Sequence, residues 1–334
     1  MRFLVAALSA VLVLAAAPAG AVGFQWATAP DPDDRPLDIG IWYPSDAPVP
    51  DHPNTPFRQA LAVNGPVSGD RLPLVVISHG NAGSLGSHAD VAKALAEAGF
   101  VVVAVTHTGN NGRDNSYRPA RRLVDRPRHI SRALDFMLTG WPGHDRLDPS
   151  RIGIFGFSLG GFTALVAIGG TPNLRLAVEH CRQDPDEPAC LSGENSNSGT
   201  AGAPRPAPSW VHDPRIRAAV IASPGLGFAF DKDALAAVTV PVQLWAAAGD
   251  RVVPEATNTA LVRQALPVPP EFREVEGAGH YAFVAPCDPA IETLKPQLWA
   301  TLCVDPPGFD RVAFHRQLDD EAVAFFRAQL PAGR

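Results

Sequence analysis

The chain has 334 residues and a formal net charge of −6 at pH 7. It contains no block of basic residues and no heptad repeat, so nucleic acid is not an expected partner. The length suits one α/β enzyme domain with insertions, and the sequence shows neither an internal repeat nor a second core.

The N-terminus has the pattern of a secretory signal peptide. Arg2 supplies the positive end, residues 3–17 form an apolar stretch, and small residues follow at 18–21. Cleavage after Ala21 fits best, with cleavage after Ala19 as the alternative. A membrane anchor would need about 20 apolar residues, and no cysteine follows either cleavage site to carry a lipid. We therefore expect a secreted or periplasmic protein without a stable membrane span, whose mature domain covers residues 22–334.

The four cysteines are an even number, which fits export into an oxidising compartment. Three pairings are open to them. The pairs Cys181–Cys190 and Cys287–Cys303 are favoured, because each closes a short loop in a polar, proline-containing stretch. The sequence has no C-x-x-C unit and no accompanying histidine pair, so we expect no metal site.

The first half of the chain predicts strands alternating with helices. Residues 24–27 and 37–43 predict an antiparallel hairpin. Residues 72–78 and 100–105 are continuous apolar runs, which are typical of central parallel strands. The amphipathic stretch 88–99 predicts a helix that joins these two strands in a right-handed crossover.

The rest of the chain continues this pattern and predicts an α/β domain, with a mostly parallel central sheet and helices on both faces. Residues 171–213 interrupt it after the third helix, and their many polar and proline residues predict an insertion that is either part of a lid or a surface loop. We expect helices over 126–138, 161–168, 255–266 and 309–329, and strands over 151–155, 216–223, 240–247 and 272–275.

The sequence G-F-S-L-G at residues 156–160 fits the G-x-S-x-G pattern of a nucleophile elbow. A short β-branched run precedes it and an apolar helical stretch follows it, and this strand–turn–helix context is what the elbow requires. Small residues at 156 and 160 leave room for the strained turn that exposes Ser158. We predict that Ser158 is a nucleophile rather than an ordinary turn residue.

A serine nucleophile needs a base, and the base needs an acid that fixes its tautomer. In α/β domains that carry a nucleophile elbow, these groups occur along the chain in the order Ser, acid, His, and each follows a strand. Ser158, Asp250 and His280 satisfy that order. Asp231 and Glu255 are the rival acids.

The loop after the strand at 72–78 is expected to complete an oxyanion hole. Its glycine turn can direct the Asn81 N–H at the point that Ser158 reaches, beside the N–H of Leu159. His79 is expected to brace this loop rather than to act as the base. His107, in the loop over 107–125, is a candidate substrate contact, with a structural role in the loop as the alternative.

With these motifs in place, the chain resembles an α/β-hydrolase of the group loosely called predicted dienelactone hydrolases, which is similar to platelet-activating factor acetylhydrolases. The resemblance spans most of the mature chain and implies the α/β-hydrolase fold with a catalytic triad. It rests on residues 77–81, 156–161, 248–254 and 277–280, and on a late segment typical of exported bacterial members, 283–287 with Cys303 and 308–311.

Two departures from the family pattern bear on function. Dienelactone hydrolases use a cysteine nucleophile, so Ser158 argues against dienelactone itself as the substrate. Platelet-activating factor acetylhydrolases take their acid from the strand just after the elbow, but residues 222–224 of this chain hold no carboxylate. The acid is therefore assigned to Asp250 by order and context.

The expected activity is hydrolysis of a small-molecule carboxylic ester through an acyl-enzyme, without a cofactor. Two alternatives remain. A serine peptidase of the same fold would cleave amides with the same triad, and a binding protein on an inactive hydrolase fold would cleave nothing. The sequence favours neither an acyl-chain length nor an oligomeric state.

Overall fold

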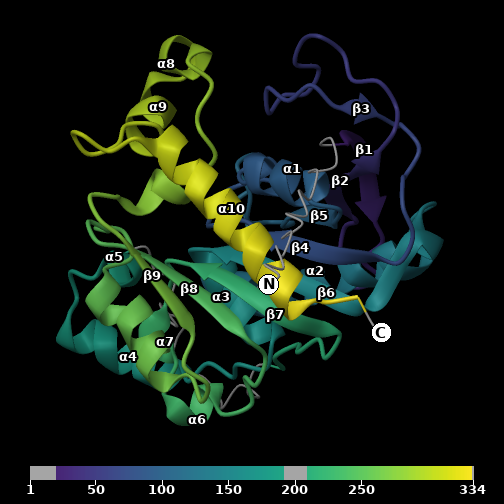
Figure 1. Cartoon of the computed structure of the whole chain (residues 1–334). Helices are drawn as coiled ribbons and strands as arrows, with labels where there is room; N and C mark the ends of the chain where they lie inside the picture. The colour runs from purple at the N-terminus through teal and green to yellow at the C-terminus, as the bar shows by residue number, and fades with distance from the viewer. Residues whose placement is uncertain (1–19, 192–208, 333–334) are drawn as a thin grey trace, which may run out of the picture.

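A computed structural model describes residues 20–191 and 209–332, and it is organised around a nine-stranded sheet (Figure 1). The strand order is β3-β1-β2-β5-β4-β6-β7-β8-β9. The strands from β5 to β9 in this order run parallel, whereas β2 pairs antiparallel with both β1 and β5. The strands are β1 (Ala21–Ala29), β2 (Leu37–Ser45), β3 (Ala62–Val63), β4 (Leu72–Ser78), β5 (Val101–Thr106), β6 (Leu147–Phe157), β7 (Ile216–Ala222), β8 (Val242–Ala247) and β9 (Glu271–Val275).

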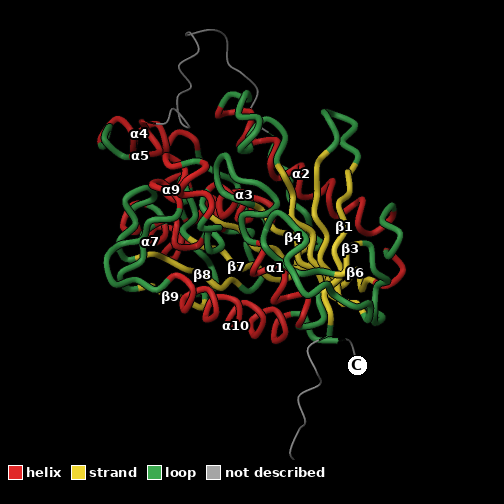
Figure 2. Tube along the Cα trace, turned by 90° about the horizontal axis from the view of Figure 1, so that it is seen from above, coloured by secondary structure: helices red, strands yellow, loops and turns green. Residues whose placement is uncertain are grey.

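Helices cover both faces of the sheet, with α1 and α10 on one face and α2 and α3 on the other (Figure 2). The predicted α/β architecture is thereby confirmed. The helices are α1 (Ala89–Glu97), α2 (Pro119–Thr139), α3 (Leu159–Ala167), α4 (Leu174–Gln183), α5 (Pro188–Leu191), α6 (Lys232–Leu235), α7 (Thr259–Ala265), α8 (Ala290–Leu294), α9 (Pro296–Leu302) and α10 (Arg311–Gln329), with 3₁₀ turns at His144–Arg146, Gly227–Ala229, Glu255–Thr257 and His280–Phe283.

The central strands are apolar throughout because both of their faces are covered. In β4, Leu74 and Val76 point into the core shared with α2 and α3. Val75 and Ile77 point into the core shared with α1 and α10. Side chains alternate between the two faces of a strand, so a strand packed on both sides needs apolar residues at every position.

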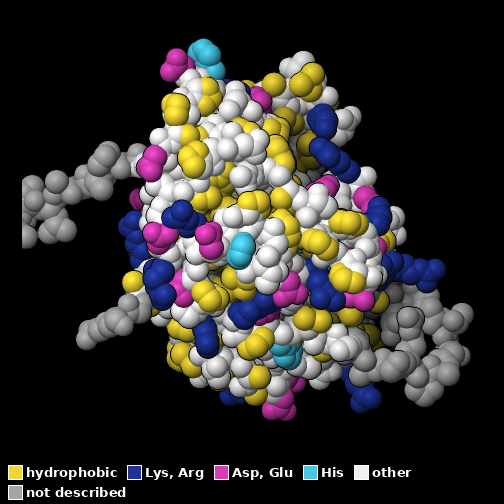
Figure 3. Space-filling model, turned by 90° about the vertical axis from the view of Figure 1, so that its right-hand side faces the viewer, with side chains coloured by type: hydrophobic (Ala, Val, Ile, Leu, Met, Phe, Trp, Pro, Cys, Tyr) yellow, Lys and Arg dark blue, Asp and Glu magenta, His cyan; other side chains and the backbone are white. Residues whose placement is uncertain are grey.

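The predicted signal peptide, residues 1–21, lies outside the described residues except for Gly20 and Ala21. Ala21 is the first residue of β1 and pairs with Ser45. The described helices include none that is both long and apolar enough to span a bilayer. On the face drawn in Figure 3, basic and acidic side chains are interspersed among apolar ones.

Helix α2 begins at Pro119, earlier than the predicted start at 126. Proline suits the first position of a helix because its fixed φ is helical and its missing N–H would have no partner there. Leu123 and Ile130 face the core on either side of Pro127, so burial of this stripe maintains the helix across an internal proline. The polar loop expected over 107–125 therefore ends at Arg118.

The insertion after the elbow helix contains regular structure in its described part. Helices α4 and α5 are joined by the Cys181–Cys190 disulfide. The His180 ring stacks on Phe228 with centroids 4.1 Å apart, which attaches α4 to the 3₁₀ turn after β7. Residues 192–208 of the insertion lie outside the described residues.

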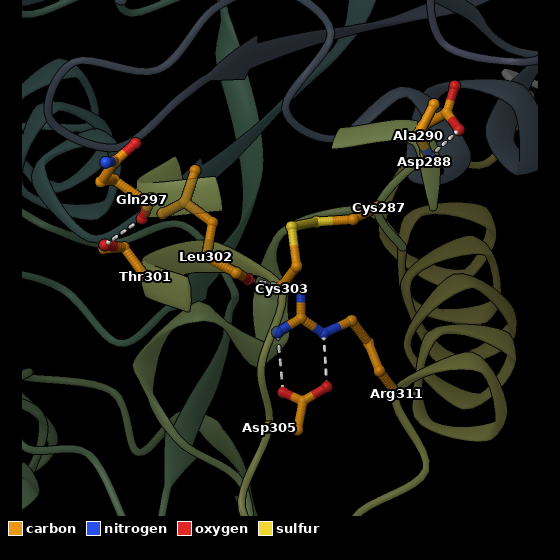
Figure 4. The surroundings of a disulfide bond; sticks show 9 residues. All are labelled: Cys287, Asp288, Ala290, Gln297, Thr301, Leu302, Cys303, Asp305 and Arg311. Carbon is orange, nitrogen blue, oxygen red and sulfur yellow. Dashed lines mark hydrogen bonds and ion pairs between the residues drawn. A yellow bond between two sulfur atoms is a disulfide. The ribbon is translucent and has the colours of Figure 1, made fainter. Parts of the chain in front are cut away.

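The second disulfide, Cys287–Cys303, encloses α8 and α9 (Figure 4). Just beyond Cys303, the Arg311 guanidinium donates two parallel hydrogen bonds to the Asp305 carboxylate, at 2.8 and 2.7 Å, and a third to the Leu302 carbonyl at 2.7 Å. These contacts fasten the cross-linked segment to the start of α10. Both disulfides have the pairing that the sequence favours.

A partly buried cluster of two aspartates and one histidine lies between α1 and α10. Asp90 of α1 pairs with His315 of α10, and Asp319 lies one turn further along α10. Burial, together with the nearby Asp90 carboxylate, raises the pKa of Asp319 to about 8 from an ordinary value of 3.8. Burial opposes the charged form of His315, but the Asp90 carboxylate outweighs it, and the pKa of His315 is raised.

We expect Asp319→Asn to raise the melting temperature by several degrees at pH 8.5 and to leave it unchanged at pH 3.5. The unfolded chain releases this proton near its ordinary pKa of 3.8, whereas the folded chain retains it up to about pH 8. The folded state binds more protons between those values, so Asp319 costs stability as the pH rises through that range. Thermal unfolding followed by circular dichroism measures the effect, with the exposed neighbour Asp320→Asn as the matched control. Equal stabilisation at both pH values would contradict the argument.

Candidate active site

Strand β6, Ser158 and α3 form a sharp strand–turn–helix. Ser158 has φ 55° and ψ −120°, a conformation that costs a non-glycine residue about 1–3 kcal/mol. A Cβ at Gly160 would lie 1.9 Å from the Ser78 carbonyl oxygen, and one at Gly156 would lie 2.2 Å from the Gly160 carbonyl oxygen. Only glycine fits at either position, so the two glycines of the motif permit the strained turn.

The structure brings Ser158, Asp250 and His280 into one hydrogen-bonded chain. The Nε2 atom of His280 lies 3.0 Å from Ser158 Oγ, and its Nδ1 atom lies 2.7 Å from Asp250 Oδ2. The three residues are 8%, 8% and 5% exposed, respectively. Asp250 can only accept from Nδ1, so the imidazole carries its proton there and Nε2 faces the serine hydroxyl as an acceptor.

The turn after β8 fixes the Asp250 carboxylate. Its second oxygen, Oδ1, accepts hydrogen bonds from the backbone N–H groups of Val252 and Val253 at 2.9 and 2.7 Å. The rival acids lie in other turns: Asp231 caps α6 by accepting from the Ala234 N–H at 2.8 Å, and Glu255 begins a 3₁₀ turn.

The loop after β4 lies directly against the elbow. A Cβ at Gly80 would lie 3.3 Å from Ser158 Cβ, so Gly80 lies next to Ser158. Asn81 is the next residue in this loop. Leu159 is the first residue of α3, and its N–H is among those that have no acceptor within the helix. The two N–H groups predicted for the oxyanion hole therefore belong to neighbouring segments.

His79 makes the contacts of a brace. Its Nδ1 lies 2.6 Å from the carbonyl oxygen of Gly80, and its Nε2 accepts from the His107 N–H at 3.1 Å. Complete burial and the nearby Arg126 guanidinium hold the pKa of His79 well below its usual value. The ring therefore stays neutral and bridges the ends of β4 and β5.

The side chain of His107, the candidate substrate contact, is fully buried. Its Nε2 lies 2.9 Å from Ser78 Oγ and its Nδ1 lies 3.2 Å from the Nδ1 of His129. These contacts are those of the alternative, in which His107 has a structural role in the loop.

Two groups of side chains among the described residues could approach a cation. Asp34, Asp125 and His129 form one, and His180, Asp184 and Glu187 form the other. The first is already neutralised by arginines, which contact both of its carboxylates. In the second, Glu187 accepts from the side chains of Thr257 and Asn258. Neither group contains a residue of the Ser158–His280–Asp250 chain.

Comparison with solved structures identifies the fold. The ferulic acid esterase from Streptomyces cinnamoneus superposes with a TM-score of 0.62 at 20% sequence identity, over 95% of this chain and 92% of that chain. The chain therefore has the α/β-hydrolase fold. The model of the dienelactone hydrolase family matches residues 59–190 of the chain, which include the elbow and end before Asp250 and His280.

The sequence relatives that match this chain fall into two kinds. An uncharacterized protein of Mycobacterium tuberculosis is 28% identical over 290 residues, which are 82% of this chain and 88% of that protein. The cutinases est1 and est2 of Thermobifida alba are 33% identical over 107 residues, which are 31% of this chain and about a third of each cutinase.

Proposed function

We propose that the protein is a serine ester hydrolase that cleaves carboxylic esters through an acyl-enzyme. One observation carries the proposal: the buried chain from Ser158 Oγ to His280 Nε2, at 3.0 Å, and from His280 Nδ1 to Asp250, at 2.7 Å. Proteins named as esterases and cutinases among the similar chains support the ester as the substrate class.

The geometry supports a two-step mechanism. In the first step, His280 Nε2 takes the Ser158 hydroxyl proton while Oγ attacks the ester carbonyl carbon. The N–H groups of Leu159 and Asn81 stabilise the resulting oxyanion. The tetrahedral intermediate collapses, the alcohol leaves with the proton from His280, and the acyl group remains on Oγ. Water then repeats the sequence, with His280 again as the base, and releases the acid.

Asp250 acts on the imidazole rather than on the substrate. It fixes the tautomer that leaves Nε2 free to accept a proton, and its charge stabilises the imidazolium that forms. The two backbone N–H groups on its other oxygen hold the carboxylate in the plane it needs.

We further propose that the protein is exported after removal of its N-terminal leader. The two disulfides support this, because such bonds persist in oxidising compartments. We also propose that the insertion borders the substrate side of the site. Its helix α4 packs on Phe228, and the Gly225 N–H three residues earlier donates to the Ser158 carbonyl at 3.0 Å.

The proposal is tested by hydrolysis of p-nitrophenyl esters from acetate to dodecanoate, beside p-nitroanilides of the same acids. A fluorophosphonate probe should label the same preparation, and peptide mass mapping should place the label on Ser158. Ester turnover with the label on Ser158 is the expected result. Rates that fall with chain length would indicate a small acyl pocket, and rates that rise would indicate a larger one bordered by the insertion. Faster turnover of the anilides would favour a peptidase, and folded protein without turnover or label would favour a binding protein.

A further inference from the structure

Arg126 lies in the first half of α2, is only 1% exposed, and contacts both β4 and the elbow helix α3. Its guanidinium donates to the carbonyl oxygen of His79 in the loop after β4, and to Ser78 Oγ at 3.4 Å. It also donates to Asn110 Oδ1 at 2.6 Å and to Thr163 Oγ1 at 3.1 Å. One rigid group therefore joins β4, the loop after β5, and the elbow helix.

One arm of this network ends at Leu159. Arg126 Nε donates to the Thr163 hydroxyl, which in turn donates to the Leu159 carbonyl oxygen at 2.8 Å. Thr163 lies one helical turn after Leu159 in α3, so the contact fixes the first turn of the elbow helix. Leu159 is the residue whose N–H is proposed to bind the oxyanion.

The other arm ends at Asn81. Asn110 accepts from Arg126 through Oδ1 and donates from Nδ2 to Asn81 Oδ1 at 2.7 Å. Arg126 also holds the His79 carbonyl directly, two residues before Asn81. Both residues that supply the proposed oxyanion donors are thus tied to the same guanidinium, each through one intermediate side chain.

We propose that Arg126 is a positioning residue that sets the spacing between the Asn81 and Leu159 N–H groups. The inference rests on the proposed function. Oxyanion donors work only when they lie about 2.7–3.1 Å from the position of the developing charge, and they must be held there in advance. The two donors belong to segments that follow different strands, so local backbone geometry alone does not fix their separation. The planar guanidinium, with its donors in fixed directions, suits this task, whereas a lysine ammonium is a single point.

The test compares Arg126→Met and Arg126→Lys with Arg128→Met, a matched control. Arg128 lies two residues further along α2 and is partly buried. Its guanidinium donates to the Asp31 carboxylate and not to the loop after β4. We expect kcat, expressed per titrated active site, to fall about 100-fold in both Arg126 variants, with KM nearly unchanged. Lysine should not restore kcat, since it keeps the charge and loses the fork. Arg128→Met should lower the melting temperature and leave kcat per active site unchanged.

A second pair of variants tests the arm through α3 even where Arg126→Met does not fold. Thr163→Val removes the hydroxyl that links Arg126 to Leu159, and we expect it to lower kcat about tenfold. Thr163→Ser retains the hydroxyl and should keep kcat near the wild-type value. The affinity for an alkyl trifluoromethyl ketone, which forms an oxyanion on the serine, should fall by the same factor as kcat in each variant.

The outcomes separate this inference from the proposed function. An active wild type with equal kcat per site in Arg126→Met, or with equal values in Thr163→Val and Thr163→Ser, would overturn the role of Arg126 alone. A loss confined to melting temperature and to the fraction of active sites would also overturn it, because that is the result of a purely structural residue. A wild type that neither hydrolyses esters nor reacts with fluorophosphonate would overturn the proposed function itself.

Discussion

Ser158→Ala is expected to lower kcat for ester hydrolysis by about 10⁶-fold, because the variant has no atom that can form the acyl-enzyme. The loss should leave the fold intact. Gly156 and Gly160 leave the room that the strained turn at Ser158 needs, and alanine is smaller than serine. Steady-state kinetics with p-nitrophenyl acetate and thermal unfolding of the same samples measure both quantities.

Ser223→Ala is the matched control for Ser158→Ala. Ser223 also follows a central strand, is 1% exposed, and has a positive φ of 38°. Its variant should retain wild-type kcat and should still react with fluorophosphonate. More than about 1% of wild-type activity in folded, pure Ser158→Ala would contradict the assignment of the nucleophile.

Asp250→Asn is expected to lower kcat by about 10⁴-fold. An asparagine amide can present a donor to His280 Nδ1, which would stabilise the tautomer with its proton on Nε2 and leave no acceptor for the Ser158 proton. The backbone contacts of Val252 and Val253 with the side-chain oxygen remain available, so the turn after β8 should keep its shape. The measurement is kcat per active site at a fixed pH, with melting temperature as the check on folding.

The rival acids supply the controls for Asp250→Asn. Asp231→Asn keeps a capping group at the start of α6, and Glu255→Gln changes a 3₁₀ turn, so neither should change kcat. A loss near 10⁴-fold in either variant, with Asp250→Asn active, would move the acid to that position.

The parts of the site that could be predicted from sequence are those encoded locally. The elbow is a contiguous pattern, and its strand, turn and helix follow each other without interruption. Asp250 and His280 could be placed because parallel strands end at one edge of a sheet, so the residues that follow β6, β8 and β9 meet there. That order selected Asp250 over Asp231 and Glu255 without any knowledge of distances.

The parts that could not be predicted depend on packing between distant segments. Arg126 stands in a stretch of arginines that has the pattern of an exposed helix face, and only its burial against β4 and α3 distinguishes it. His107 follows a strand, like His280, but its ring turns inward onto Ser78 and His129. The early start of α2 at Pro119 depends on the burial of Leu123 against the rest of the fold, and local helix propensity carries no information about that burial.

The position of β9 has a consequence for how the protein loses activity. Strand β9 is the outermost strand at its end of the sheet, pairs only with β8, and has exposed residues at two positions, and it leads directly to His280. Ser158 follows β6, which has partners on both sides. Edge strands open at a lower free-energy cost than the centre of a sheet. Heat or denaturant should therefore detach His280 before it displaces Ser158. Loss of the proposed esterase activity should then precede the loss of secondary structure. Two features should delay the detachment of β9 and His280. Arg273 of β9 forms an ion pair with Glu321 of α10, and the Cys287–Cys303 disulfide cross-links the segment that follows His280.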